Sequence, residues 1–275
     1  GKWSVESMKK ILSSLPVRLI IGVVIGIIIG LGSADLWIGG TDVGGTIMQV
    51  VLTLKNLLGS LINFCVPLII IGFIAPSITR LRSNASRMLV LALALAYTSS
   101  VCAALMSMGA GYAIIPGLSI QSAAEGLREA PELLFNLDIA PVMSVMSALV
   151  FSVLVGLAAT WTRAKVITQV LEEFQRVVLA VVSRVVIPIL PFFIAGTFCG
   201  LAYEGSITRQ LPVFLIVILI VMVGHYLWLA VLYLLAGLYS GENPWEVLRH
   251  YGPAYLTAVG TMSSAATLAV ALEGA

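Results

Sequence analysis

Hydroxyl side chains gather near the end of this sequence, in a stretch that is otherwise apolar. Within GPAYLTAVGTMSSAATLAVALEGA, which covers residues 252–275, the hydroxyls belong to Thr257, Thr261, Ser263, Ser264 and Thr267. Gly260 comes just before the densest part of the cluster, where helix propensity is weak. Hydroxyls and free backbone amides at a broken helix are well suited to binding a small anionic group. Small residues also let another helix approach closely, so a packing interface is the alternative.

A second group of hydroxyls, in LALAYTSSVCAAL, comprises Thr98, Ser99 and Ser100 in the middle of an apolar segment. Such hydroxyls commonly bond back to the carbonyl four residues earlier or to a neighbouring helix. The alternative is a site for a small hard cation, because such ions need several oxygens, and hydroxyls can supply them together with freed carbonyls. The sequence leaves both interpretations open.

The ionisable residues placed furthest into apolar runs are Lys55, Arg184 and His225. A charge within a bilayer is costly and by default indicates a function. Lys55 and Arg184 could instead extend their charged ends to the lipid headgroups, and His225 could be neutral and hydrogen-bonded between helices. No Asp or Glu lies in the interior of the first six apolar segments, since Asp35 falls at the end of the first, so the sequence shows no carboxylate proton relay.

The composition points to lipid as the main solvent of this chain. Sixty per cent of the residues are apolar and 10% are charged, whereas soluble domains have roughly 25% charged residues. The net charge of +2 and the lack of a basic run exclude a nucleic-acid partner. The three cysteines lie in apolar stretches without metal-ligand spacing, so we expect them to pack as small hydrophobic residues.

The elements that must position these residues are long apolar helices. We expect an all-α integral membrane protein with six transmembrane helices, over residues 16–38, 47–80, 86–115, 141–161, 177–203 and 211–239. Pro67 and Pro76 should tilt or kink the second helix, and Pro188 and Pro191 should interrupt the fifth. Residues 121–138 form the one long hydrophilic connector, with a short helix expected over 123–134.

Charged connectors predict the orientation of these helices. Lys and Arg predominate before the first helix and in the second-to-third and fourth-to-fifth connectors, which should therefore be cytoplasmic. The first apolar segment is long for a signal peptide, so we interpret it as a helix of the mature protein with the N-terminus inside. The terminal hydroxyl-rich segment must then re-enter the membrane from the cytoplasm. Backbone that is not helical within the membrane must be covered by protein or must line a water-filled cavity. We therefore expect the hydroxyls to line a polar pocket at the tip of a re-entrant hairpin.

The terminal segment PAYLTAVGTMSSAATLAVALE resembles the first re-entrant hairpin of the dicarboxylate/amino acid:cation symporters, the glutamate-transporter family. Its hydroxyls fit the family pattern D-A-x-x-T-A-x-x-T-x-S-S-S-x-T-L-P in register, although Ala265 and Ala269 replace the third serine and the proline. NFCVPLIIIGFIAPSITRL is similar to the family's second helix, and LALAYTSS is similar to its third. The resemblance follows the helix order along nearly the whole chain.

The resemblance implies symport of an acidic or small neutral amino acid, or a C4-dicarboxylate, coupled to sodium or protons by an elevator mechanism. It implies substrate binding at Thr261, Ser263, Ser264 and Thr267, and cation binding at Thr98 and Ser99. It assigns residues 1–240 to six transmembrane helices, which include scaffold and trimer-forming helices, and residues 241–275 to part of the hairpin. A multi-pass homotrimer in a bacterial plasma membrane is expected, with no cofactor beyond the coupling ion.

The family's later helices, which hold most of its substrate and sodium ligands, are not in this sequence, so we expect an incomplete chain that does not transport alone. A membrane scaffold or assembly subunit is the alternative, with the hydroxyls serving as packing contacts. An intramembrane serine enzyme is disfavoured, because Ser263 and Ser264 have no activating base in the sequence unless His225 reaches one of them.

Overall fold

The computed structural model describes residues 12–81, 85–117, 127–250 and 255. Nearly all of the regular structure is helical, and the expected all-α membrane architecture is confirmed. Helices long and apolar enough to cross a membrane span, within the described residues, Leu15–Ser33, Val43–Arg80, Ser86–Gly117, Lys165–Glu204 and Ser206–Ser240. The shorter apolar helix α5, Val145–Trp161, has 17 residues. The expected total of six membrane-spanning helices remains a prediction.

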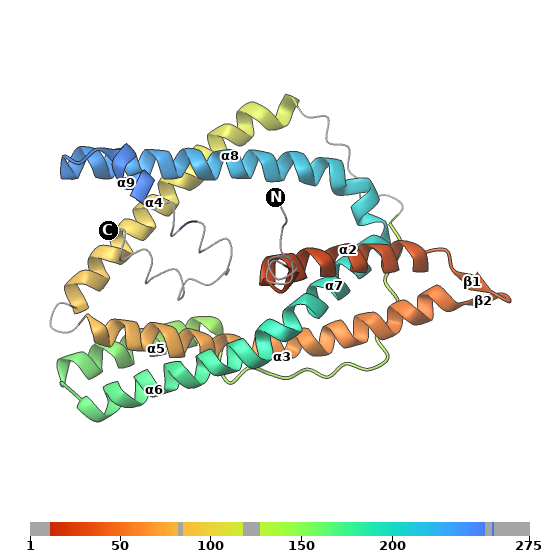
Figure 1. The fold of residues 1–275 in the computed structure, drawn as a ribbon, viewed down its shortest axis with the longest axis horizontal. Coiled ribbons are helices and arrows are strands. Elements are labelled where there is room, and N and C mark those ends of the chain that lie inside the picture. The colour runs from red at the N-terminus through yellow and green to blue at the C-terminus, as the bar shows by residue number, and fades with distance from the viewer. Residues whose placement is uncertain (1–11, 82–84, 118–126, 251–254, 256–275) are drawn as a thin grey trace, which may run out of the picture.

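Helix α2 (Leu15–Ser33) packs along α7 (Ile187–Glu204) through a stripe of glycines (Figure 1). Gly22, Gly26 and Gly30 are spaced by four residues, so they share one face of α2. A Cβ atom at Gly22 would lie 2.8 Å from the Pro191 carbonyl oxygen, and at the other two glycines it would clash with backbone of α7. The absence of these side chains lets the two backbones approach, as at other small-residue interfaces between membrane helices.

The long helix α3 (Val43–Arg80) supports this pair. Met48 of α3 is fully buried against Cys199 and Tyr203 of α7. Pro67 and Pro76 lie inside α3 and are both buried, and helix assignment continues through them. The helix is therefore continuous at both prolines, and the tilt or kink that they were expected to cause stays a prediction.

The predicted end of the first helix was wrong. The first helix ends at Ser33, and a two-residue turn at Gly39 and Gly40 then joins strands β1 (Trp37–Ile38) and β2 (Thr41–Asp42). Both glycines have positive φ, 63° and 83°, as tight hairpin turns require. Asp42 then accepts a hydrogen bond of 2.8 Å from the Gly45 N–H, which caps the start of α3.

The fifth helix begins well before the predicted residue 177. Helix α6 (Lys165–Val181) continues through a π turn, Val182–Val186, into α7. The sequence predicts a connector over α6 because charged residues interrupt its apolar pattern. Pro188 has no N–H to donate to the Arg184 carbonyl, so the hydrogen-bond ladder is already interrupted where the π turn lies.

The connector over residues 127–144 is extended rather than helical, and α5 starts at Val145 rather than at residue 141. The described part of the expected short helix is therefore absent. Pro131 and Pro141 explain this, because neither has an N–H to donate and each disfavours a helical conformation of the residue before it. Figure 1 shows this segment running beside α3.

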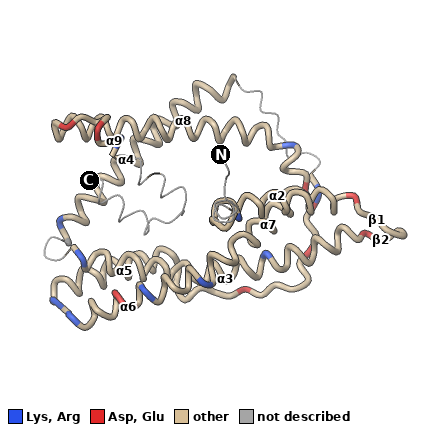
Figure 2. The backbone as a smooth tube through the Cα atoms, viewed as in Figure 1, with Lys and Arg blue, Asp and Glu red and all other residues tan. Residues whose placement is uncertain are grey.

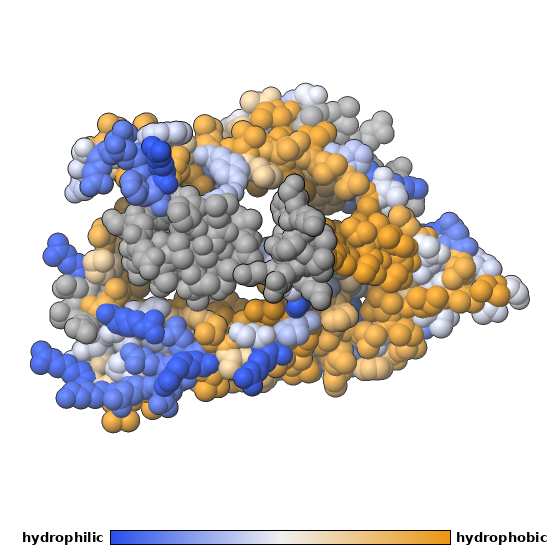
Figure 3. Space-filling view, viewed as in Figure 1, coloured by the Kyte–Doolittle hydropathy of each residue, from blue (hydrophilic) through white to orange (hydrophobic). Residues whose placement is uncertain are grey.

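The remaining long helices, α4 (Ala85–Ile114) and α8 (Ser206–Ser240), stand apart from the α2–α3–α7 group (Figure 1). None of the described side chains of α4 is buried. Apolar side chains cover much of the visible surface (Figure 3), whereas Lys, Arg, Asp and Glu lie mostly toward helix ends and connectors (Figure 2). This distribution suits a bilayer as the solvent.

Candidate functional site

The predicted cation ligands Thr98 and Ser99 lie near the middle of α4. The Ser99 hydroxyl accepts a hydrogen bond of 3.1 Å from the Trp228 indole N–H of α8. Ser99 is half-buried, whereas Thr98 is exposed. Successive side chains on an α-helix point about 100° apart, so only one of the pair can face α8.

The contact with Trp228 does not exhaust the hydrogen-bonding capacity of Ser99. A serine hydroxyl has two lone pairs and one proton, and the indole N–H occupies one lone pair. The indole contact leaves the second lone pair of the hydroxyl available to another partner. Trp228 was not singled out from the sequence; the available signal was a tryptophan within an apolar helix, whose N–H needs a partner when covered.

The predicted substrate ligands Thr261, Ser263, Ser264 and Thr267 lie outside the described residues. The chain leading to them is described up to α9 (Pro244–His250) and at Tyr255. The Tyr255 and Tyr226 hydroxyls form a hydrogen bond of 2.7 Å. Tyr226 and Trp228 occupy the same turn of α8, so the start of the terminal segment and the Ser99 contact meet the same part of that helix.

The ionisable residues within apolar runs do not converge on this site. Half-buried Lys55 packs its aliphatic stem against Gly196, where a Cβ atom would lie 2.8 Å from the Lys55 Cβ. Lys55 also borders an apolar cavity of about 320 Å³ between α2, α3 and α7. Arg184 is exposed in the π turn, and exposed His225 meets the Tyr226 ring edge-on with centroids 6.2 Å apart.

The cysteines follow the packing interpretation in two of three cases. Cys65 and Cys199 are buried, and the Cys199 thiol contacts the Met48 sulfur at 3.4 Å. Cys102, on α4, is exposed. Its exposure reflects the position of α4, which presents described apolar side chains outward along its length.

A polar stripe along α3 holds the extended connector. The Leu134 N–H donates to the Thr53 hydroxyl at 3.1 Å, and the Asn56 amide donates to the Asn136 side chain at 2.9 Å. Further along the helix, Ser60 and Asn63 line a cavity of about 350 Å³ shared with the connector. Irregular backbone in a membrane protein needs such partners, since lipid offers none.

The sequence contained this signal, although it was not recognised. Polar residues at positions 53, 56, 60 and 63 recur at three- and four-residue intervals, which places them on one face of a helix. In an otherwise apolar helix, such a stripe predicts a polar partner along that face.

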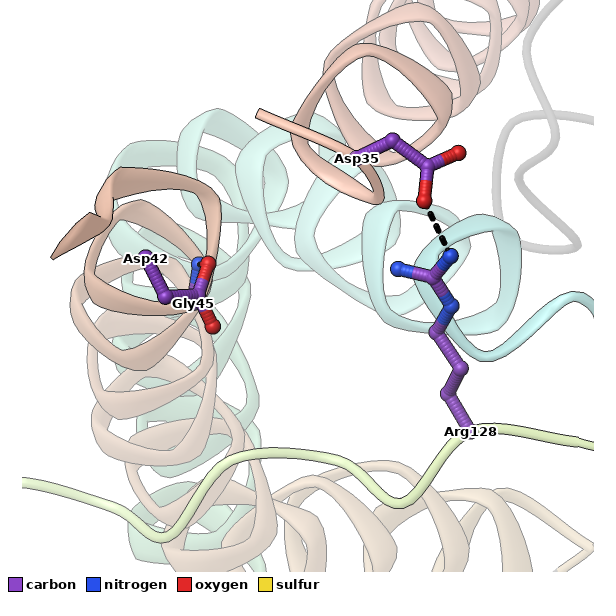
Figure 4. Close-up of polar contacts among 4 residues, drawn as sticks. All are labelled: Asp35, Asp42, Gly45 and Arg128. Atoms are coloured by element: carbon purple, nitrogen blue, oxygen red, sulfur yellow. Dashed lines mark hydrogen bonds and ion pairs between the residues drawn. The ribbon is translucent and has the colours of Figure 1, made fainter. Parts of the chain in front are cut away.

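Arg128 fixes the start of the extended connector to two other elements (Figure 4). Its guanidinium pairs with Asp35, just beyond α2, and lies 6.0 Å from the centroid of the Tyr203 ring. Its backbone N–H donates to the Glu204 carbonyl at 3.0 Å. The hydrogen bond with Asp35 raises the pKa of Arg128 above its ordinary value, so the guanidinium is charged at every relevant pH.

Comparison with protein families gives a match. The model of the sodium:dicarboxylate symporter family matches residues 15–275. The matched region includes α4, α8 and the hydroxyl-rich terminal segment. No curated protein sequence matches the chain.

Proposed function

Because this chain belongs to the sodium:dicarboxylate symporter family, we propose that it forms part of a symporter for a C4-dicarboxylate or for an acidic or small neutral amino acid. The observation that supports this most is the family match itself, which continues to residue 275 and thus includes Thr261–Thr267. Membership in a transporter family also favours transport over the serine-enzyme interpretation.

We assign substrate binding to the hydroxyls of Thr261, Ser263, Ser264 and Thr267. Hydroxyls and backbone amides at a broken helix can bind a carboxylate without a buried countercharge. This assignment requires the segment to enter the membrane and break near Gly260. Its departures from the family pattern, Ala265 and Ala269, remove one hydroxyl and one helix-breaking residue.

We assign Thr98 and Ser99 to binding of the coupling ion, sodium or a proton. The Trp228 contact supports the assignment for Ser99, because it fixes the hydroxyl while leaving a lone pair. In the elevator mechanism that we propose, α4, α8 and the terminal segment move together with the solute. The Ser99–Trp228 and Tyr226–Tyr255 contacts join these elements, as a rigid moving unit requires.

The rest of the chain would be the stationary part. Extensive contacts between α2 and α7, and between α3 and both α5 and α7, support a fixed scaffold formed from these helices. The same proposal includes assembly into a homotrimer through the scaffold helices. It also includes residence in the plasma membrane with the N-terminus in the cytoplasm. The transmembrane helices would occupy residues 1–240, and the partial re-entrant hairpin would occupy residues 241–275.

Ligand-induced stabilisation of the purified full-length protein tests the substrate class. A bound solute raises the midpoint of thermal unfolding, by an amount that grows with concentration above the dissociation constant. Succinate, aspartate and serine are added separately, with sodium present or replaced by choline. We expect a sodium-dependent rise with at least one solute.

Ser264→Ala should reduce this rise, whereas Ser240→Ala, which alters a hydroxyl at the end of α8, should not. Equal responses of wild type and Ser264→Ala would remove Ser264 from the binding site. A lack of response to every tested dicarboxylate and amino acid, with folded protein, would contradict the substrate class.

A further inference from the structure

The ends of α3, α4, α5 and α6 meet at one corner of the molecule, where cations gather (Figure 2). Two side-chain hydrogen bonds connect these helices: Arg80, at the end of α3, donates to Gln175 within α6, and the Trp161 indole N–H, at the end of α5, donates to the Ser86 hydroxyl near the start of α4 at 2.9 Å. We call this the basic corner and define it by the exposed side chains of Arg80, Arg87, Arg163 and Lys165. Among the described residues, none of these cations pairs with a carboxylate.

One residue of the basic corner has a strained backbone conformation. Arg163 follows α5 with φ of 53°, a left-handed conformation, and is the one described non-glycine residue with positive φ. Glycine is the usual residue at such a helix end, because a side chain is strained there. The conformation of Arg163 therefore costs some local stability.

The start of α6 adds to the attraction for anions. Its first turn contains no acidic residue, and no side chain caps its N-terminal N–H groups. Lys165 occupies the first helical position, where the positive end of the helix dipole disfavours a cation. The electrostatic repulsion between Lys165, Arg163 and this helix end would be relieved by a bound anion.

Helix α6 also presents an apolar strip beside these charges. One side of its apolar face packs on α3, with Leu171 and Val178 buried. The adjacent side is exposed at Val166, Val170 and Val177, of which Val166 is 72% exposed. Polar and charged residues occupy the opposite face, and Figure 3 shows hydrophilic surface over α5 and α6 at this end. An amphipathic helix of this kind lies at the boundary between headgroups and acyl chains.

We propose that the basic corner and the apolar strip of α6 bind anionic phospholipids of the adjacent membrane leaflet. The cations contact the headgroup phosphates, and the acyl chains cover Val166, Val170 and Val177. Trp161, 65% exposed beside the corner, is placed at the headgroup level that tryptophan prefers. The inference is independent of the transported solute.

A lipid is favoured over other anions because charge and apolar surface adjoin on one helix. A soluble anion or an acidic peptide would satisfy the cations without covering the valines. Clusters of basic residues at the membrane surface recognise anionic lipids in this way, with each cation contributing about a fivefold increase in affinity.

Lipid enrichment around the full-length protein tests the proposal. The protein is placed in nanodiscs of equal parts phosphatidylglycerol and phosphatidylcholine, and the lipids that remain bound on release are identified by native mass spectrometry. We expect enrichment of phosphatidylglycerol that weakens with salt. The combined substitution Arg80→Gln, Arg163→Gln and Lys165→Gln should reduce the enrichment strongly and leave only the contribution of Arg87.

Two controls separate this effect from a general loss of charge or fold. Arg249→Gln removes an exposed cation from α9, away from the corner, and should keep the enrichment. Arg80→Lys with Arg163→Lys retains the charges and should keep most of it, which would show that the corner tolerates substitution.

Bulk lipid composition around the wild type would overturn the proposal, as would undiminished enrichment in the triple glutamine variant. The proposal would also fail if the wild type were an oligomer and the triple glutamine variant were a monomer with the same phosphatidylglycerol enrichment. The basic corner would then be an interface between copies of the chain.

Discussion

The glycine stripe of α2 predicts that one added methyl group separates two helices. In Gly26→Ala, the new Cβ atom would meet the backbone of Ala195, including its carbonyl oxygen. A backbone atom cannot move aside by changing a rotamer, so α2 must shift away from α7. Overpacking of this kind costs about 2 kcal/mol.

Gly32→Ala is the matched control, since a Cβ atom there would have nothing within 4 Å. Both substitutions replace a glycine of α2 by the better helix former, with a gain of up to about 1 kcal/mol that is smaller for Gly32 in the last turn. The difference between them therefore reports mainly the packing cost. For a chain of this size, about 2 kcal/mol corresponds to about 4–8 °C in the midpoint of thermal unfolding.

The assay is thermal unfolding in detergent, followed by the loss of the monodisperse peak in fluorescence-detected size-exclusion chromatography. Gly26→Ala should unfold about 4–8 °C below Gly32→Ala. Equal midpoints for the two variants would refute the reasoning, because the close approach of α2 and α7 would then contribute nothing to stability.

Other predictions concern the moving helices and the extended connector. Ser99→Ala should raise the sodium concentration for half-maximal solute binding about tenfold. Trp228→Phe should raise that concentration less, since the indole acts through Ser99. An unchanged sodium dependence in Ser99→Ala would remove Ser99 from the cation site. Thr53→Val leaves the Leu134 N–H without its partner and should speed amide hydrogen exchange there, while an unchanged rate would mean that the contact is dispensable. Arg128→Gln should increase protease cleavage of the connector more than Arg128→Lys, and equal cleavage would show that the guanidinium contacts do not restrain it.

Helix type and order follow from the sequence because long apolar runs have one stable backbone arrangement in lipid. Boundaries were harder where polar and apolar signals compete. The charges of α6 suggested a loop, yet its apolar residues share one face, so the helix begins at Lys165. The prolines of α3 predicted a tilt or kink without ending the segment, and the helix continues through Pro67 and Pro76.

The candidate site was predictable only in part. Hydroxyls identified Ser99 as a possible ligand, but its partner lies on α8, 129 residues away in sequence, and no local pattern links the two. The α3 stripe is the opposite case, because its spacing alone was enough to indicate a polar partner, although that prediction was not made. Its partner is the extended connector at Leu134 and Asn136, which follows only from the tertiary arrangement.

Solute uptake driven by a sodium gradient tests the assignment to sodium-coupled transport most directly. The full-length protein is reconstituted into liposomes and given labelled succinate, aspartate or serine, with an inward sodium gradient, a proton gradient or neither. We predict accumulation of at least one solute above its external concentration under the sodium gradient, which collapses when an ionophore dissipates that gradient. Failure of every solute to accumulate, or accumulation that is the same without any ion gradient, would contradict it.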